Sequence, residues 1–305
     1  MIKELTREAI FADRCEVADK IIFGDKGRKK KRNKIIILFF FIFFLGVHFH
    51  SIAQFTPEEL AERAKWEEFL KTAEITSFYQ MKSREAVTEP WVLTLEKDGI
   101  KRQAVWKDIE GRSKGSIENW RWEIAAYRLD KYLSLNMVSP TVEKRFRGNR
   151  GSCQLWVDYW IKAKVKNEQK IKVPSYKVFY YNRTTYLRWA WDNLIANDDR
   201  HAGNFFITKD WRIILPDHSR SFRTSKKFTQ SLIYTEKHKE GPKVMKELPR
   251  AFFEKLKALN FEAIKDAVGE YLTDREINAL LVRKDLIIDE INERIKKLGE
   301  DKVLY

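Results

Sequence analysis

The sequence is poor in cysteine and has no apolar run of full membrane-spanning length. Its 305 residues contain two cysteines, Cys15 and Cys153, which excludes a disulfide-rich scaffold and a metal site built from several thiolates. The longest apolar run, IIILFFFIFFLGV at 35–47, has thirteen residues, whereas a membrane-spanning helix needs about 20. With 44% apolar and 34% charged residues, the chain has the composition of a globular protein, large enough for one two-lobed domain or two small ones.

The chain also lacks the clustered basic and aromatic pattern of a nucleic-acid-binding module, although its formal net charge is +15. The segment DKGRKKKRNK at 25–34 holds seven basic residues and one acid, and so contributes +6 of this charge. The remaining +9 is spread over the rest of the chain. We therefore expect a generally basic surface, with possible contact to an anionic membrane and no nucleic-acid partner.

The basic segment and the apolar run that follows it are typical of a secretory signal peptide. Small residues follow the run, and we predict cleavage after Ala53. The alternative is a single-pass membrane anchor, in which the apolar stretch extends through His48 and His50. In both cases the basic flank stays inside and the residues from about 54 onward face outside. Residues 1–53 are thus a predicted signal peptide or anchor, and the protein is predicted to be exported.

The next hundred residues are rich in strand patterns. Residues 54–73 form a predicted helix, since the TPEE sequence at 56–59 combines a capping box with proline in the first turn. Residues 74–160 then contain several extended segments and one helix, at 120–135, with apolar residues at helical spacing. Asp98-Gly99 predicts a tight hairpin between two of the strands. This part of the chain is predicted to be an antiparallel sheet with an inserted helix.

The last part, residues 161–305, has mainly helical patterns. A helix is predicted at 184–197, a short hairpin around Lys209-Asp210, and a helical tail whose last helix follows a capping box from Thr273 to Glu276. A β-rich part followed by a helical part predicts an α+β fold with a cleft between the two parts.

Three polar residues, Asp199, Asn204 and Asp217, are spaced along the chain in a way that suits phosphoryl transfer. NDDRHAGNFF at 197–206 places Asn204 five residues after Asp199, and LPDHSRSF at 215–222 delivers Asp217 just after the predicted hairpin. Phosphoryl transfer needs a group that orients or deprotonates the acceptor, together with an Asn and an Asp that hold divalent cations against the phosphates. The Asp-x₄-Asn spacing is that of a kinase catalytic loop.

The β-rich part offers complementary groups. Lys107 ends a predicted strand, where it can reach donor phosphates, and Glu123 lies on the following helix, where it can pair with Lys107. No Gly-x-Gly-x-x-Gly occurs between the first two strands, and MKSREAVT at 81–88 stands there instead. Lys82 and Ser83 in this segment are candidates for phosphate contact, with a solvated turn as the alternative.

These motifs resemble the catalytic core of the phosphatidylinositol 3-/4-kinase-like group of atypical kinases. That group includes bacterial kinases of the HipA type and secretory-pathway kinases. The resemblance rests on DNLIANDDRHAGNFF and IILPDHSRSF, and extends to AVWK, WEIAAYRLDKYLSLNMVSPTV and GSCQLWV, over roughly residues 75–225. It implies a bilobal protein-kinase-like α+β fold, with an antiparallel β-rich N-lobe and an α-helical C-lobe.

The same resemblance implies an enzyme that uses ATP and Mg²⁺ or Mn²⁺. It places Asp199 in the catalytic loop, Asn204 and Asp217 on metal, and Lys107 on phosphate with Glu123 beside it. Both Asp199 and His201 are candidates for the base, and His201 has the alternative role of bracing the loop.

The predicted function is transfer of the γ-phosphoryl group of ATP to a hydroxyl of a protein, a lipid or a small molecule. One alternative is a pseudokinase or an enzyme on the same fold that transfers AMP. The other is a non-enzymatic, basic module that binds membrane surfaces.

Overall fold

The computed structural model describes residues 55–81, 89–113 and 115–305. The predicted signal peptide or anchor therefore lies outside the described residues, as do Lys82 and Ser83. Within the described ranges, no helix combines the length and the apolar character needed to cross a membrane.

The predicted N-terminal helix is present as two short helices in succession, α3 (Pro57–Ala61) and α4 (Arg63–Thr72). The capping box at the start of α3 is formed as predicted, because the backbone N–H and side chain of both Thr56 and Glu59 bond reciprocally. At the end of α4, the buried Lys144 ammonium donates to the carbonyl oxygens of Leu70 and Ala73. This contact fastens the helix to the sheet, because it satisfies carbonyls that a helix end leaves without partners.

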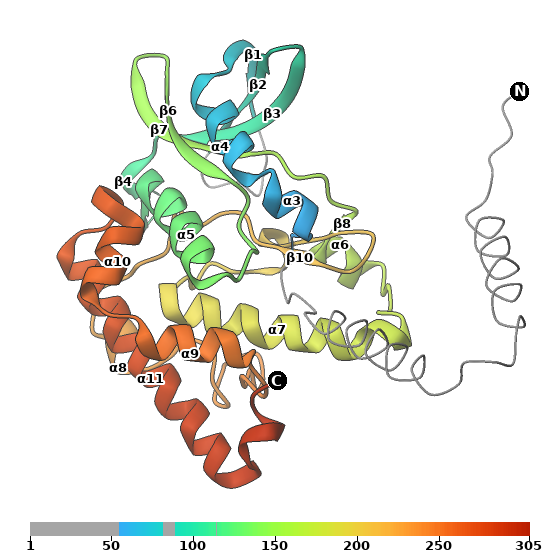
Figure 1. Cartoon of the computed structure of the whole chain (residues 1–305), viewed down its shortest axis with the longest axis vertical. Helices are drawn as coiled ribbons and strands as arrows, with labels where there is room; N and C mark the ends of the chain where they lie inside the picture. Colours follow the sequence, from blue (N-terminus) through green and yellow to red (C-terminus); the bar gives the residue numbers. More distant parts are fainter. Residues whose placement is uncertain (1–54, 82–88, 114) are drawn as a thin grey trace, which may run out of the picture. The chain divides into compact units, whose positions relative to one another are not determined.

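The described N-terminal part is built on an antiparallel sheet of five strands in the order β1-β2-β3-β7-β6 (Figure 1). The strands are β1 (Glu74–Gln80), β2 (Trp91–Lys97), β3 (Ile100–Lys107), β6 (Thr141–Phe146) and β7 (Asn149–Leu155). The hairpin predicted at Asp98-Gly99 is present, and both residues have positive φ angles of 51° and 73°. One face of the sheet packs on α4 around Trp106 and Leu93.

Between β3 and β6 the chain forms a small hairpin and then a central helix. The hairpin consists of β4 (Glu110–Ser113) and β5 (Ser116–Asn119), and it leads into α5 (Trp120–Leu133). Asn119 caps α5 through a bond from the Arg121 backbone N–H to its side-chain oxygen, at 2.9 Å. The helix lies between the sheet and the helical part of the chain and contacts both (Figure 1), so its side chains link the two.

The C-terminal part is helical, with a small sheet at its edge. Its helices are α6 (Ala163–Glu168), α7 (Ser175–Ile195), α8 (Lys227–Gln230), α9 (Arg250–Ala258), α10 (Phe261–Val268) and α11 (Asp274–Leu298). Single-turn 3₁₀ helices lie at Ala202–Asn204, Gly269–Tyr271 and Glu300–Lys302. The small sheet has the order β10-β9-β8, from β8 (Ile161–Lys162), β9 (Phe206–Ile207) and β10 (Ile213–Ile214).

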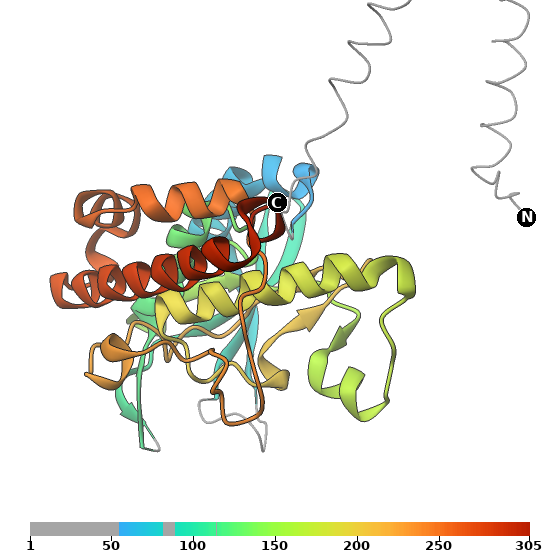
Figure 2. The ribbon, with the colours of Figure 1, turned by 90° about the horizontal axis from the view of Figure 1, so that it is seen from below.

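The long helices α7 and α11 lie side by side and share one core with α5 and α9 (Figure 2). Fully buried side chains of this core include Trp191, Ile124 and Leu280. The predicted α+β class is therefore confirmed: an antiparallel sheet precedes a helical part. The short hairpin predicted around Lys209-Asp210 is present as β9 and β10.

Candidate active site

A cavity of about 440 Å³ lies between the sheet and the helical part. Apolar side chains form two of its walls: Met81, Pro90 and Val105 on the sheet side, and Phe206, Ile214 and Leu215 on the helical side. Polar side chains line one end: Lys107, Glu118, Asp199, His201, Asn204, Asp217, Ser219 and Arg220. A slot with apolar walls and a charged end fits a ligand that is flat at one end and anionic at the other. A larger groove beside α11 contains none of the predicted site residues.

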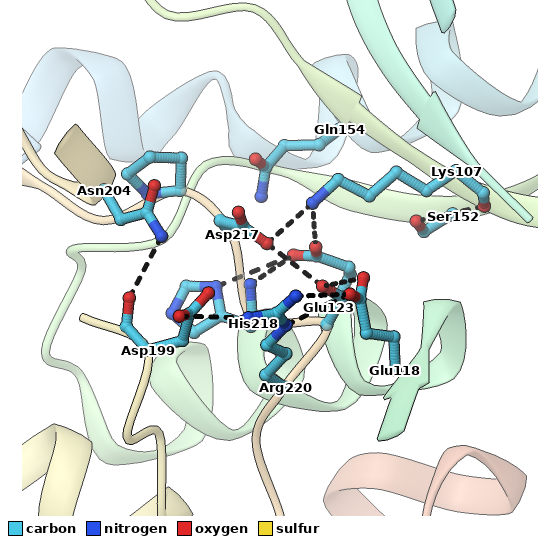
Figure 3. Close-up of polar contacts among 12 residues, drawn as sticks. Lys107, Glu118, Glu123, Ser152, Gln154, Asp199, Asn204, Asp217, His218 and Arg220 are labelled. Atoms are coloured by element: carbon cyan, nitrogen blue, oxygen red, sulfur yellow. Dashed lines mark hydrogen bonds and ion pairs between the residues drawn. The ribbon is translucent and has the colours of Figure 1, made fainter. Parts of the chain in front are cut away.

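Lys107 lies at the end of β3, and its ammonium group contacts two carboxylates (Figure 3). Its Nζ is 2.5 Å from Glu123 Oε1 and 2.9 Å from Asp217 Oδ1, and its side chain is 11% exposed. Burial disfavours the charged ammonium, but Asp217 and Glu123 outweigh this effect and raise the pKa of Lys107. Lys107 is therefore a fixed positive charge at the polar end of the cavity.

Glu123 has a second contact that the sequence did not indicate. Its Oε2 accepts a hydrogen bond of 2.9 Å from the backbone N–H of His218, the residue after Asp217. Burial opposes ionisation of this carboxyl, but the Lys107 ammonium outweighs it and lowers the pKa of Glu123. The pKa of Asp217 is lowered for the same reason. The α5 glutamate thus holds both Lys107 and the loop that carries Asp217.

The loop with Asp199 begins where α7 ends. Asn197 joins this loop to the following one, because its Oδ1 accepts from the backbone N–H of Asp199 at 3.2 Å and its Nδ2 donates to the carbonyl of Asp217 at 3.3 Å. The Nδ2 of Asn204 donates to the carbonyl of Asp199 at 3.1 Å. With Nδ2 engaged, Oδ1 is the atom of Asn204 that is left to bind a cation.

Arg200 is a residue that sequence reasoning missed. Its side chain is fully buried, and its Nε donates to Asp192 at 3.1 Å. Its Nη1 donates to the backbone carbonyls of Asn204, at 2.7 Å, and of Pro216, while Nη2 lies 3.0 Å from His218 Nε2. Arg200 therefore ties together the two backbone segments that carry Asn204 and Asp217. Asp192, an acid inside the predicted helix eight residues earlier, was the signal available in the sequence.

His201 lies on the cavity wall with an exposed ring. Its Nδ1 accepts a hydrogen bond of 3.1 Å from the backbone N–H of Gly203. This contact engages Nδ1 and braces the short turn at 202–204, which is one of the two roles predicted for this residue.

The cavity offers oxygen ligands for a divalent cation. Four carboxylates are each paired with Lys107 or Arg220: Glu118, Glu123, Asp199 and Asp217. Within the described ranges, no three His, Cys, Asp or Glu side chains are arranged to hold a metal ion. Mg²⁺ usually binds one or two carboxylates and completes its coordination with substrate phosphates and water. The oxygens of Asp217 and Asn204 fit that pattern.

A sheet lysine paired with a helix glutamate, and an Asp-x₄-Asn loop across a cleft between a β-rich and a helical lobe, define a protein-kinase-like fold. Comparison with solved structures agrees. The Golgi casein kinase aligns with a TM-score of 0.56 and 16% identity, covering 83% of this chain and 79% of that one. The same kinase with Mn/ADP bound gives 0.57 and 17%, covering 83% and 80%. Hydra Fam20 with sugar gives 0.58 and 15%, covering 84% and 95%.

At this level of identity the likeness shows the fold alone. No protein-family model matches the sequence, and a search of curated proteins gives no match. The structural neighbours are secretory-pathway kinases, and what this chain shares with them is the atypical kinase-like fold. The phosphatidylinositol-kinase and HipA branches stay a resemblance of sequence.

Proposed function

We propose that the protein is an ATP- and divalent-metal-dependent phosphotransferase that moves the γ-phosphoryl group of ATP to a hydroxyl acceptor. The observation that carries the proposal is the contact of Lys107 with both Glu123 and Asp217, at the charged end of a cavity that Asp199 also lines. A neighbour of the same fold binds Mn and ADP, which supports nucleotide and metal as the ligands here.

Each side chain then has a distinct task. The apolar walls bind the base of the nucleotide, and Lys107 binds donor phosphate oxygens. Asp217 and Asn204 hold the cation, which supplies positive charge against the phosphates when it is bound. Asp217 keeps Oδ2 for this purpose, because Lys107 and the Ser219 hydroxyl contact its Oδ1 at 2.9 and 3.1 Å.

The reaction needs one proton acceptor. The acceptor oxygen forms a bond to the γ-phosphorus, the bond from that phosphorus to the β–γ bridging oxygen breaks, and ADP leaves. The hydroxyl proton goes to Asp199, whose pKa is raised by burial, with partial compensation by Arg220. His201 is the alternative base.

The acceptor is proposed to be a protein hydroxyl, with a lipid or small-molecule hydroxyl as the alternative. The support is a structural neighbour that is a casein kinase. Casein is therefore a rational first acceptor to test, beside mixed phospholipid vesicles.

The deciding experiment incubates the protein with ATP labelled at either the α- or the γ-phosphate, in Mg²⁺ or Mn²⁺. Transfer of the γ-label alone is expected. Transfer of the α-label instead identifies AMP transfer, nucleotide binding without transfer identifies a pseudokinase, and salt-sensitive vesicle binding without turnover identifies a membrane-surface module.

We also propose that residues 1–53 direct export, with support from the Golgi enzyme among the structural neighbours. A reporter that is active only outside the cytoplasm should be active when fused to residues 1–60. N-terminal sequencing of the mature protein should begin at Gln54, and an uncleaved, soluble cytoplasmic product would contradict the signal peptide.

A further inference from the structure

Arg220 lies at the charged end of the cavity, three residues after Asp217, and bridges two carboxylates (Figure 3). Its Nη1 is 3.1 Å from Asp199 Oδ1. Its Nε and Nη2 are 3.0 and 2.8 Å from Glu118 Oε1. The guanidinium thus reaches the proposed proton acceptor on one side and is anchored on the other.

The anchor is built into the fold. Glu118 lies on β5, directly before α5, and its side chain is buried. Its Oε2 lies 3.3 Å from the Ser219 hydroxyl, which is also 3.1 Å from Asp217 Oδ1. A buried carboxylate is costly unless a cation and hydrogen bonds compensate it. Glu118 therefore fixes the position of Arg220 in the absence of any ligand.

Arg220 lies close to the place where the proposed roles of Asp199 and Asp217 put the γ-phosphoryl group. The acceptor hydroxyl is placed at Asp199 and the cation at Asp217, so the γ-phosphoryl group has to lie between these two residues during transfer. A guanidinium has five N–H donors in a planar fork that matches phosphate oxygens. The three bonds to Asp199 and Glu118 leave two of the five donors for such oxygens.

We propose that Arg220 is a further catalytic residue, which binds the γ-phosphoryl group during transfer and is held in place by the positioning residue Glu118. The inference rests on the proposed phosphotransferase function. Arg220 supplies charge and hydrogen bonds only; the acceptor oxygen attacks phosphorus, ADP leaves, and the proton goes to the base. Arginines that neutralise a transferring phosphoryl group raise turnover by about 10³–10⁵-fold in other phosphotransferases.

The competing role for Arg220 is a salt bridge that only steadies Asp199. The two roles differ in nucleotide binding, because ATP carries the γ-phosphate and ADP does not. If Arg220 contacts that phosphate, Arg220→Gln weakens binding of ATP but not of ADP. A salt bridge to Asp199 alone affects neither affinity.

The matched control is Arg223→Gln. Arg223 lies three residues further on, has the same 14% side-chain exposure, and faces Asp198 at 3.9 Å without lining the cavity. Its Nε donates to the backbone carbonyl of Arg220 at 3.0 Å, so this variant tests whether disturbing the segment alone reproduces the effect of Arg220→Gln. The substitution removes the same charge from the same segment. We expect Arg223→Gln to leave turnover and both affinities within about twofold of the wild type.

The experiment uses the full chain, with calorimetric titration of Mn·ATP and Mn·ADP and single-turnover rates with γ-labelled ATP. For Arg220→Gln we expect a rate loss of about 10³-fold and an ATP dissociation constant raised about tenfold, with that for ADP unchanged. Glu118→Gln should give a smaller rate loss, about tenfold, with the same preferential effect on ATP. Equal losses for ATP and ADP, or an unchanged rate in Arg220→Gln, overturn the inference.

Failure of the inference is separate from failure of the proposed function, since the latter appears as absence of γ-phosphoryl transfer in the wild-type protein. If Arg220→Gln does not fold because Glu118 is left unpaired, the double variant Arg220→Gln/Glu118→Gln removes the buried charge as well. The double variant should fold and keep the preferential loss of ATP binding; a double variant that binds ATP as the wild type does overturns the inference.

Discussion

The two sides of the cavity hold their acids in opposite ways. On the side proposed to bind phosphate, which we call the phosphate side, Glu123 is 3% exposed and shares Lys107 with Asp217. The pKa of each acid is lowered, because the ammonium outweighs the effect of burial. On the side proposed to bind the acceptor hydroxyl, which we call the acceptor side, Asp199 is 33% exposed. The pKa of its carboxyl is raised, because burial outweighs the contact with Arg220.

The difference follows from the elements that carry these residues. Lys107 ends a strand and Glu123 lies on the central helix, so the backbone of the core fixes their separation. Asp199 lies on a loop that side-chain amides hold in place. Acids that stay ionised suit the binding of a metal ion and the positioning of the Lys107 ammonium, whereas a carboxyl with a raised pKa suits proton transfer near neutral pH.

The largest expected loss of turnover comes from removing the Asp217 carboxylate on the phosphate side. Asp217→Ala should lower the single-turnover rate by about 10³-fold or more, since the cation loses its only proposed carboxylate. The matched control is Asp210→Ala, which should retain activity. Asp210 lies on the turn between β9 and β10 and pairs with Arg212, outside the cavity. A well-folded Asp217→Ala protein with wild-type turnover would show that the site assignment is wrong.

Loss of the Asp199 carboxylate on the acceptor side should slow turnover but leave nucleotide binding unchanged. Asp199→Asn keeps the shape and hydrogen bonding of the side chain but cannot accept a proton, so the rate should fall by about 10²-fold while ATP affinity stays within about twofold. Measurement of both quantities on one preparation checks this. If Asp199→Asn turns over normally and His201→Gln carries the loss, His201 is the base.

Removal of the Lys107 ammonium, which Glu123 and Asp217 share, should weaken ATP binding and also lower the stability of the fold. Lys107→Ala should raise the ATP dissociation constant about tenfold, or about 1.4 kcal/mol, and lower the free energy of unfolding by about 3–5 kcal/mol, because Glu123 is left buried without its partner. Denaturant unfolding and titration with ATP measure the two effects. Lys107→Ala/Glu123→Gln should recover stability without recovering ATP affinity, and recovery of both would contradict the role of Lys107 in phosphate binding.

The smallest expected effect is a pH dependence that sharpens the comparison. The pKa of Asp199 is raised from its ordinary value of 3.8, and the ionised form is the base, so kcat/KM should fall about tenfold per pH unit as the pH drops below that raised pKa. Glu123 and Asp217 have lowered pKa values and stay ionised over the same range.

The variant Arg220→Gln should move the fall in kcat/KM at acid pH to higher pH, because the substitution removes a cation beside Asp199. An acid limb that persists unchanged in Asp199→Asn would assign it to another group.

Local features of the fold were predictable from the sequence. The capping boxes at Thr56 and Thr273 and the Asp98-Gly99 hairpin are present as predicted, because a few neighbouring residues suffice to specify each of them. The apolar spacing of 120–135 likewise identified α5. By contrast, α7 begins at Ser175, well before the predicted start at 184. The sequence did not predict its first turns, because their exposed aromatic side chains form no regular apolar stripe.

Within the site, the sequence by itself determined which groups are available: an Asp-x₄-Asn loop, an aspartate after the next hairpin, a strand-end lysine and a helix glutamate. Only the tertiary structure decided how they meet. Lys107 and Asp217 are 110 residues apart, and Glu118 and Arg220 are 102 apart. The sequence analysis predicted neither the hairpin β4–β5 that carries Glu118 nor the buried contacts of Arg200 with two separate loops. Such contacts depend on how the sheet, α5 and the loops pack around a shared core, and packing is a property of the whole fold that no short stretch of sequence encodes.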